Sequence, residues 1–569
     1  MLDGRAIRTL RRHVGTALLL GLVLLVLIAY ILYPSLRVVW ESLQDRGAFS
    51  LRHYRTFFSL KEFSHIEALL HSLYISAGSV VLAALVGVPL AFVFTRYEFP
   101  GRPIFAALAV FPIALPPLVG VISFLFLYGE SGMIPRGLQA ILGLDRVPFA
   151  VDGVPAIFLV HAYTMYVYFY LFVSAALSGM ESSTVEAAAN LGGSRFFVFR
   201  KVTLPLLIPA LVGAALLVFM TSMASFTAPL VFAGGYRVLS LQIYFSKLNG
   251  DMEMAITQTV VLATFSMVFL LVLRWYSGRR RYQMAGKGTR GHRRTIRGGR
   301  IRFLVGALGI VGVIILMLPH LTIVLLSFVK DGTWTWQVLP PSYTVENYLR
   351  LFRDPRIMEP ILNSLKMAGL ATSGNLIFGV LAAYLLAKRV FPGKSIVEVL
   401  VMLPWALPGT VVAIHLIVAF NEGTVFSGGQ ILVGTFWILP LAYFVRHIPL
   451  VVRSSYAALE QFDTSLEEAA RNLGASWGRA FRKVVLPAIL PGVFAGTLIA
   501  FVSALGEFVS SILLYISTNR PISVEIWSQL RLFNFGSAAA YGVFLILLIS
   551  ATLLFSHKVL GVRSQRAFV

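Results

Sequence analysis

The sequence predicts an all-α polytopic membrane protein of about 12 transmembrane helices, arranged as two parallel six-helix repeats. Three observations predict this fold. The chain has 569 residues, of which 57% are hydrophobic and only 13% charged, whereas a soluble protein carries roughly 25% charged residues. Apolar runs long enough to cross a bilayer, which takes about 20 residues, recur along the chain. One polar segment occurs twice, 282 residues apart (468 − 186).

Twelve spans are expected from the positions of the apolar runs. They fall near residues 16–36, 71–95, 104–128, 154–177, 205–230, 256–275, 303–327, 361–387, 396–420, 433–452, 487–515 and 536–556. The first run follows a basic segment and resembles a signal peptide, but it lacks a small-residue cleavage site, so we expect an uncleaved helix. With both termini in the cytoplasm, every loop rich in Lys and Arg falls on the cytoplasmic side. We therefore expect a multi-pass protein of a bacterial-type inner membrane.

Three regions are expected along the chain. The first half covers residues 1–275 with a repeated polar loop at 181–204, a basic linker covers 276–302, and the second half covers 303–569 with its loop at 463–486. The linker has ten Lys and Arg residues and no acid. We interpret it as a cytoplasmic connector near anionic lipid headgroups, with a regulatory contact as the alternative. The net charge of +23 is therefore assigned to cytoplasmic loops and lipid, not to nucleic acid.

The internal repeat extends beyond the polar loops. His71–Ser72–Leu73 corresponds to Asn363–Ser364–Leu365, 292 residues later (363 − 71), and the offset falls to 282 after the third span of each half. The second half has therefore lost about ten residues from an external loop, where length changes cost little. Because six spans return the chain to the same side, the two halves are parallel, and we expect a pathway between them.

The repeated segment reads Glu186–Ala187–Ala188–Ala189–Asn190–Leu191–Gly192 in the first half and Glu468–Ala469–Ala470–Arg471–Asn472–Leu473–Gly474 in the second. An Ala-rich segment with an acid at its start predicts a short helix. The glycine predicts a helix end, and a proline follows at the start of the next span. We expect a helix–turn–helix on the cytoplasmic surface, fixed to the fifth span of each half.

This pattern resembles the coupling loop of binding-protein-dependent ABC importer permeases, the family known for its EAA motif, and the resemblance covers nearly the whole chain. It implies that Glu186 and Glu468 make the polar contact to an ATPase subunit. It further implies that small residues allow close approach and that glycines form the turn; these are Ala187, Ala188, Ala469, Ala470, Gly192 and Gly474. Gly193 replaces Ala475 of the second copy, which predicts a looser turn in the first.

The same resemblance implies the partners: two cytoplasmic P-loop ATPase subunits, an extracytoplasmic solute-binding protein and the lipid bilayer. ATP and Mg would be bound by the ATPase subunits, and no cofactor, metal or catalytic residue is expected on this chain. The sequence Gly393–Lys394–Ser395 has Lys388 where a P-loop requires its first glycine. We therefore expect a translocation subunit that is not itself an enzyme.

The substrate is less clearly marked than the family. The second half, at Leu441–Arg446, Ser510–Tyr515 and Ile526–Trp527, resembles ferric-iron permeases, which implies ferric iron as the cargo. Relatives for thiamine, polyamines, phosphonates or sulfate share the architecture and stay open as alternatives. A secondary transporter with parallel repeats is a further alternative, but it would need more intramembrane ionisable groups for ion coupling. A membrane-embedded enzyme would need clustered histidines and carboxylates, which the spans lack.

Polar residues and prolines inside the spans are the candidates for the pathway. Glu507 lies within the eleventh span, where a carboxylate costs about 2.5–3.5 kcal/mol, and its repeat partner is Ser225. We expect both to lie in the translocation path or gate; the alternative is a structural pair of Glu507 with a donor such as His415. Prolines at matching positions inside spans predict kinked, cavity-lining helices, with a kink that serves packing alone as the alternative; these are Pro112, Pro116, Pro404 and Pro408.

Four polar residues in the spans are expected to have structural roles. His161 and His415 have no second ligand at helical spacing, so we expect hydrogen-bonded packing rather than metal binding. Arg446 and its neighbour His447 lie near the predicted cytoplasmic end of the tenth span. For these two we expect side chains that extend towards the headgroups.

Overall fold

The protein is described here from a computed structural model. It describes residues 4–61, 63–180, 182–279, 294–295, 298–334 and 337–559. Most of the predicted basic linker and the first residue of the first polar loop lie outside these ranges, as do the last ten residues of the chain.

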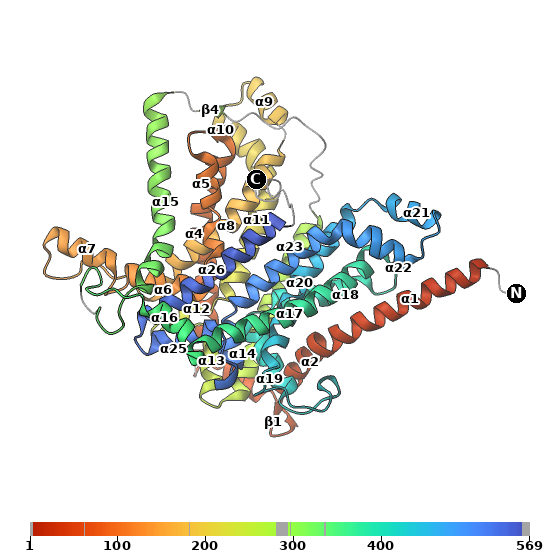
Figure 1. The fold of residues 1–569 in the computed structure, drawn as a ribbon. Helices are drawn as coiled ribbons and strands as arrows, with labels where there is room; N and C mark the ends of the chain where they lie inside the picture. Colours follow the sequence, from red (N-terminus) through yellow and green to blue (C-terminus); the bar gives the residue numbers. More distant parts are fainter. Residues whose placement is uncertain are drawn as a thin grey trace.

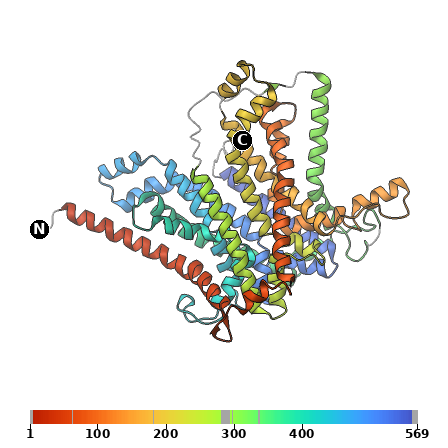
Figure 2. The same cartoon turned by 180° about the vertical axis from the view of Figure 1, so that it is seen from behind.

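The first half is built almost wholly of helices (Figures 1 and 2). Its helices are α1 (Gly4–Leu27), α2 (Tyr33–Ser42), α3 (Arg52–Phe57), α4 (Ser64–Arg96), α5 (Arg102–Leu108), α6 (Pro117–Tyr128), α7 (Met133–Leu142), α8 (Gly153–Gly179), α9 (Ser182–Asn190), α10 (Arg195–Val198), α11 (Leu204–Met223), α12 (Thr227–Phe232), α13 (Leu239–Leu248) and α14 (Met252–Arg279). Short 3-10 or π segments are η1 (Ile28–Leu32), η2 (Phe111–Ala114) and η3 (Phe199–Thr203).

The second half repeats this order of elements. Its helices are α15 (Gly299–Ser327), α16 (Glu346–Arg353), α17 (Pro355–Lys388), α18 (Lys394–Ala406), α19 (Gly409–Phe420), α20 (Ile438–Gln461), α21 (Thr464–Asn472), α22 (Trp477–Ala480), α23 (Leu486–Leu505), α24 (Val509–Leu514), α25 (Ile522–Arg531) and α26 (Phe535–Val559). Its short 3-10 or π segments are η4 (Val425–Ser427), η5 (Phe481–Val485) and η6 (Ser517–Asn519).

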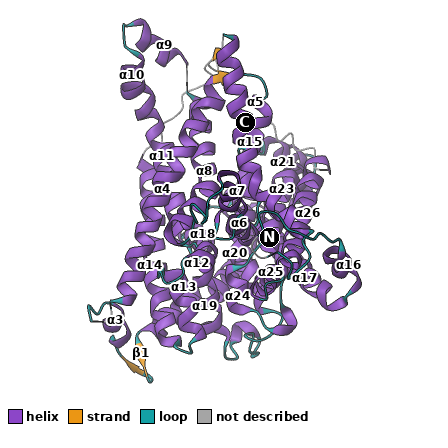
Figure 3. Ribbon diagram, turned by 90° about the vertical axis from the view of Figure 1, so that its left-hand side faces the viewer, coloured by secondary structure: helices purple, strands orange, loops and turns teal. Residues whose placement is uncertain are grey.

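The strands are two residues each and form two small pairs (Figure 3). β1 (Gln44–Asp45) and β2 (Ala48–Phe49) form an antiparallel hairpin in which Asp45 faces Ala48. β3 (Tyr97–Glu98) pairs in parallel with β4 (Arg294–Thr295). The second pair brings the described part of the linker between the halves back to the end of α4.

The helices confirm the predicted all-α membrane fold. Within the described ranges, ten helices are long and apolar enough to cross a membrane, or eleven when the bent pair α18 and α19 counts as one span. The expected tenth span overlaps α20, which is not among these helices. Its three charged residues, Arg446, Arg453 and Glu460, lower its mean hydropathy below that of its neighbours. The difference from twelve thus has a compositional cause.

The core of each half is a set of three mutually packed helices. α4, α8 and α11 pack together in the first half, and α17, α20 and α23 pack together in the second. A matching hydrogen bond recurs in both: Ser72 Oγ accepts from the Leu239 backbone N–H, and Ser364 Oγ accepts from the Ile522 backbone N–H, each at 2.8 Å. The repeat predicted from the sequence is therefore a structural repeat.

The first helices of the halves pack across to the opposite half. α1 packs against α17 and α18, and α2 packs against α19. α15, the first helix of the second half, packs against α5 and α6 of the first half and against α26 (Figure 1). The two halves therefore share a continuous core, and α9 and α21 lie at the opposite end of the molecule from β1 and α13 (Figure 1).

Candidate functional site: two coupling loops and the breaks of the central helices

The two polar loops have the same backbone geometry. The turns that follow α9 and α21 contain Gly192 and Gly474, which have φ values of +86° and +87°. In this left-handed region glycine avoids the clash that a side chain would cause. The glycine N–H groups donate to Ala189 and Arg471 respectively, each at 3.0 Å.

A second hydrogen bond closes each turn. The residue after each glycine donates its backbone N–H to the carbonyl five residues earlier, Gly193 to Ala188 at 3.2 Å and Ala475 to Ala470 at 3.1 Å. Together with the glycine bond this is a Schellman motif, the common C-terminal cap of a helix. The looser turn predicted for the first copy is therefore wrong, because the second bond uses backbone atoms that glycine and alanine share.

Each loop is rigidly continuous with the fifth span of its half. α10 and α22 lead through the π turns η3 and η5 into α11 and α23 without a break in the helix. The π turns sit at the same register, since Phe199 and Phe481 are 282 residues apart (481 − 199). Each loop is therefore joined by continuous helix to the core of its half.

The loops expose both acidic and apolar side chains. Glu186 and Glu468 are exposed, and Leu191 and Leu473 are each 89% exposed at equivalent positions. A single exposed leucine is common on protein surfaces. Here, however, an exposed leucine follows an exposed glutamate at the same spacing in both copies. This arrangement suits a protein surface that receives each loop.

Glu507 lies where the helix after the second loop breaks. The break between α23 and α24 is at residues 506–508, and Glu507 is 8% exposed. Its Oε2 lies 2.8 Å from Arg446 Nε of α20. Its Oε1 accepts hydrogen bonds from the backbone N–H and the hydroxyl of Ser510, at 3.0 and 2.9 Å.

Hydroxyl groups satisfy the backbone at the same break. The Glu507 carbonyl accepts from Ser511 at 2.6 Å and from Ser523 at 2.8 Å. Ser511 Oγ is also 2.7 Å from the Tyr443 hydroxyl. The break in the helix therefore leaves the Glu507 carbonyl hydrogen-bonded. Irregular backbone is tolerated inside a membrane when its polar groups are satisfied in this way.

The equivalent position in the first half has no ion pair. Ser225, at the break between α11 and α12, lies 2.8 Å from His161 Nε2. The other ring nitrogen, Nδ1, lies 2.8 Å from Ser79 Oγ and 3.2 Å from Ser222 Oγ. His161 occupies the position of Tyr443 (443 − 161 is 282), so a neutral histidine–serine cluster stands where the second half has an ionic one.

The comparison with known proteins identifies the family. The family described as "binding-protein-dependent transport system inner membrane component" matches residues 81–282 and 375–561, which together are more than half of the chain. The chain belongs to this family. The double match confirms the fused architecture of two halves that was predicted from the sequence.

Several curated relatives match most of this chain. It is similar to a probable ABC transporter permease protein of Sinorhizobium fredii, with 28% identity over 513 residues, covering 89% of this chain and 90% of the relative. It is 27% identical over 551 residues to the ferric transport system permease protein FbpB of Actinobacillus pleuropneumoniae, covering 95% of this chain and 78% of the relative. The chain is therefore a multi-pass permease of the ABC importer type.

Other relatives match one part of the chain. The sulfate transport system permease protein CysT of Salmonella typhimurium is 33% identical over 232 residues, covering 39% of this chain and 83% of the relative. Among solved structures, a chain of a bacterial ABC transporter involved in alginate import matches with a TM-score of 0.38 and 19% identity, covering 46% of this chain and 96% of that chain.

Two of the four candidate prolines, Pro116 and Pro408, stand at breaks in their spans, whereas Pro112 and Pro404 lie inside short helices. Pro112 lies in η2 and Pro116 precedes α6, and at the matching positions Pro404 lies in α18 and Pro408 precedes α19. α18 and α19 meet at 110°. Leu115 and Leu407, which precede Pro116 and Pro408, have extended backbone, as expected for the residue before a proline. All four prolines are buried, and their pathway-lining role stays a prediction.

The structure corrects two expectations about polar residues. Arg446 does not extend to the headgroups: it pairs with Glu507, and His447 is buried with Nδ1 2.8 Å from the Tyr443 carbonyl. The reason is the length of α20, which continues to Gln461, so that Arg446 lies in the middle of the helix. The suggested pair of Glu507 with His415 is also wrong.

Both histidines pack as predicted, through hydrogen bonds. His415 Nδ1 lies 3.3 Å from Ser35 Oγ of α2, and His161 contacts three serines. Arg446 is the functional candidate that the sequence reasoning missed. Two opposite charges at depth in neighbouring spans, Arg446 and Glu507, would have been the signal, because an unpaired charge is too costly there.

Proposed function

We propose that this chain is the inner-membrane permease of an ABC importer for ferric iron, powered by two cytoplasmic ATPase subunits that dock on the two coupling loops. The observation that carries the proposal is the pair of superimposable loop geometries at Gly192 and Gly474, each continuous with a central helix. Two loops of matching geometry would offer equivalent docking sites to the two ATPase subunits. ATP and Mg would be bound by those subunits, since the sequence has no P-loop.

The orientation follows from the same loops. We place α9, α21 and both chain termini in the cytoplasm, in agreement with the positive-inside rule. The opposite end, which carries β1 and α13 (Figure 1), would then receive solute from an extracytoplasmic binding protein. Closure of the ATPase subunits would move the loops, and through α11 and α23 it would change the breaks at Ser225 and Glu507, where we place the path or gate.

Iron as the cargo is supported by the coverage of the relatives. The ferric permease of Actinobacillus pleuropneumoniae aligns with 95% of this chain. Sulfate is the second candidate, because the sulfate permease of Salmonella typhimurium has a higher identity, 33%, although over 39% of the chain. The two cargoes differ in charge sign, which makes them easy to separate by experiment.

The test is uptake into proteoliposomes that contain this chain, its ATPase partner and its binding protein. We expect ATP-dependent accumulation of radiolabelled ferric iron, with no competition by excess sulfate. Accumulation of labelled sulfate instead would contradict the iron proposal and support the second candidate. A binding protein that purifies with another bound solute would exclude both cargoes while leaving the transport mechanism intact.

A further inference from the structure

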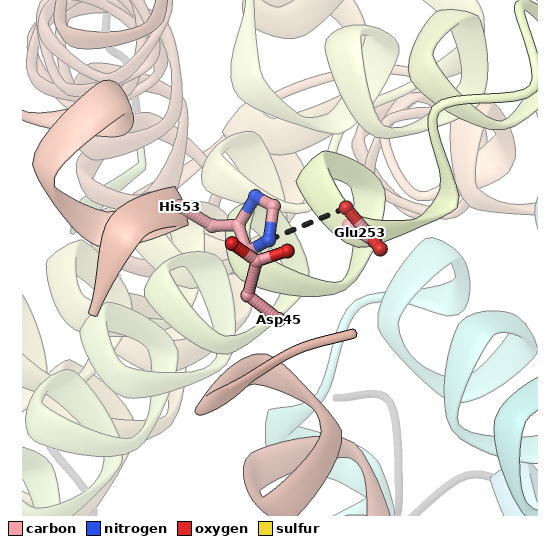
Figure 4. A group of neighbouring side chains, drawn as sticks. All are labelled: Asp45, His53 and Glu253. Carbon is pink, nitrogen blue, oxygen red and sulfur yellow. Dashed lines mark ion pairs between the residues drawn. The ribbon is translucent and has the colours of Figure 1, made fainter. Parts of the chain in front are cut away.

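A group of three potential metal ligands lies at the end of the molecule opposite the coupling loops (Figure 4). Asp45 ends β1, His53 lies in α3, and Glu253 lies in the first turn of α14. One ligand atom from each residue lies within 4.8 Å of the other two. Figure 4 shows the Asp45 carboxylate at the lower edge of the imidazole ring and the Glu253 carboxylate to the right of the ring.

The scaffold around the group is well defined. The β1–β2 hairpin sets Asp45 opposite Ala48, and α3 packs against α14. Next to this contact, Phe57 of α3 stacks on His65, with ring centroids 5.9 Å apart, and His65 Nδ1 is 3.3 Å from Gln258 Nε2 of α14. The three ligands are therefore brought together by tertiary packing, not by one flexible loop.

The contacts within the group are incomplete. His53 Nε2 is buried and has no hydrogen-bond partner, although Glu253 Oε2 is 3.3 Å away. Asp45 is contacted by the Arg52 guanidinium at 3.3 Å. The positive charge of Arg52 therefore offsets only one of the two negative charges on Asp45 and Glu253. The two carboxylates repel each other at this separation.

A cation between the three side chains would resolve this imbalance. Neutral imidazole and carboxylate oxygens together suit first-row transition metals, and three protein ligands leave coordination positions open for water or another ligand. Glu253 is exposed, and Asp45 and His53 are half-buried. A metal at this place would be reachable from the outer surface.

We propose that Asp45, His53 and Glu253 form a binding site for a first-row transition-metal cation at the outer face of the permease. Metal binding stands on this geometry alone. The further role, a first acceptor for iron released by the binding protein, rests on the proposed function. The site would hold the cargo at the rim of the membrane domain, on the half-buried surface between α3 and α14.

The test is Mn²⁺ binding to the purified full-length permease. Binding is measured as the loss of the electron paramagnetic resonance signal of the free ion. We expect one strongly bound ion per chain, displaced by ferric nitrilotriacetate. His53→Ala and Glu253→Gln should each weaken binding at least about tenfold, because even the loss of a residue that only supports a ligand costs about 10–100-fold in metal affinity. The matched control is Glu67→Gln, which removes an acid of the same face that pairs with Arg237 and should leave binding unchanged.

The outcomes separate this site from the proposed cargo. Wild-type protein that binds no more Mn²⁺ than the His53→Ala variant would overturn the metal site, even if iron is transported. Mn²⁺ binding that depends on the three residues, without any iron uptake, would uphold the site and contradict iron as the cargo. Retention of the ATPase partner by each variant shows that the substitutions have not unfolded the chain.

Discussion

The two halves agree closely at the repeated polar loops and differ at the breaks of their central helices. At the loops, both copies have a glycine at nearly the same φ, the same pair of capping hydrogen bonds and a leucine of the same exposure. At the breaks, the first half has a neutral cluster around His161 and Ser225, and the second has the Arg446–Glu507 ion pair. The halves are therefore alike at the loops, where we propose that the ATPase subunits dock, and unlike at the breaks, where we propose the pathway.

The largest expected effect is at the symmetric loops. Glu468→Lys and Glu186→Lys each reverse a charge on an exposed surface, so the fold should survive while docking to the ATPase subunit is lost. We expect each variant to reduce ATP-driven uptake to background and to lose an ATPase subunit on purification. Glu422→Lys, an exposed charge reversal outside the loops, is the control. Normal uptake in both loop variants would remove the docking proposal.

The asymmetric breaks predict unequal losses of stability. Arg446→Met leaves the Glu507 carboxylate buried without its cation, a change that typically costs about 3–5 kcal/mol. Ser225→Ala removes a neutral hydrogen bond to His161, which contributes about 1 kcal/mol. Thermal unfolding of the purified variants measures the difference. Equal losses would show that the two breaks are energetically equivalent, and the double replacement of Arg446 and Glu507 by apolar residues should recover most of the loss.

Function at the breaks is tested by a smaller change. Glu507→Gln keeps the shape of the side chain but removes its charge, and we expect altered uptake or an altered basal ATPase rate. Ser225→Ala should change these rates less, because no charge is involved. If both rates of Glu507→Gln match those of the wild type, Glu507 has only a structural role.

Alanine at the turn glycines should have equal effects in the two copies. Gly192→Ala and Gly474→Ala place a side chain at positive φ, which costs about 1–2 kcal/mol. No atom lies within 4 Å of the added Cβ at either position, so the loss comes from the backbone alone. We expect weaker coupling of ATP hydrolysis to uptake, by the same factor in each variant. A marked difference between the two variants in this factor would contradict equal coupling through the two loops.

The smallest expected effect is a pH dependence at the start of α21. The Asp463 carboxylate accepts a hydrogen bond from the Ser465 backbone N–H at 2.9 Å, which lowers its pKa from the ordinary value. Its stabilisation of the helix is therefore present above the ordinary pKa and is lost as the pH falls through the lowered pKa. Ser194, which caps α10 with a hydroxyl, provides a comparison that does not titrate.

Amide hydrogen exchange of residues 464–472 and 195–198 measures this effect. Protection of α21 should decrease below the ordinary pKa of an aspartate, whereas protection of α10 should not. The Asp463→Asn variant should show little further change with pH. Parallel loss of protection in both helices would point to general acid unfolding instead.

The loops were predictable from the sequence and the breaks were not. The repeated Glu–Ala–Ala segment, with its glycine and proline, is a short stretch of sequence that predicts the local backbone geometry of each loop. The Arg446–Glu507 pair joins α20 to the break between α23 and α24, and it depends on where α20 ends. Hydropathy placed this end too early, because the charged residues of α20 lower its mean hydropathy. Asp45 and Glu253 are separated by about 200 residues, so only the packing of α3 on α14 brings them together.

The central claim, that motor subunits drive this chain through its loops, is tested most directly by uptake into proteoliposomes with and without ATP. The complete system, with the ATPase partner and binding protein, should accumulate its solute only when ATP is present. Proteoliposomes that contain this chain alone should accumulate none. ATP-independent accumulation by the chain alone would contradict the claim and indicate an ion-coupled secondary transporter.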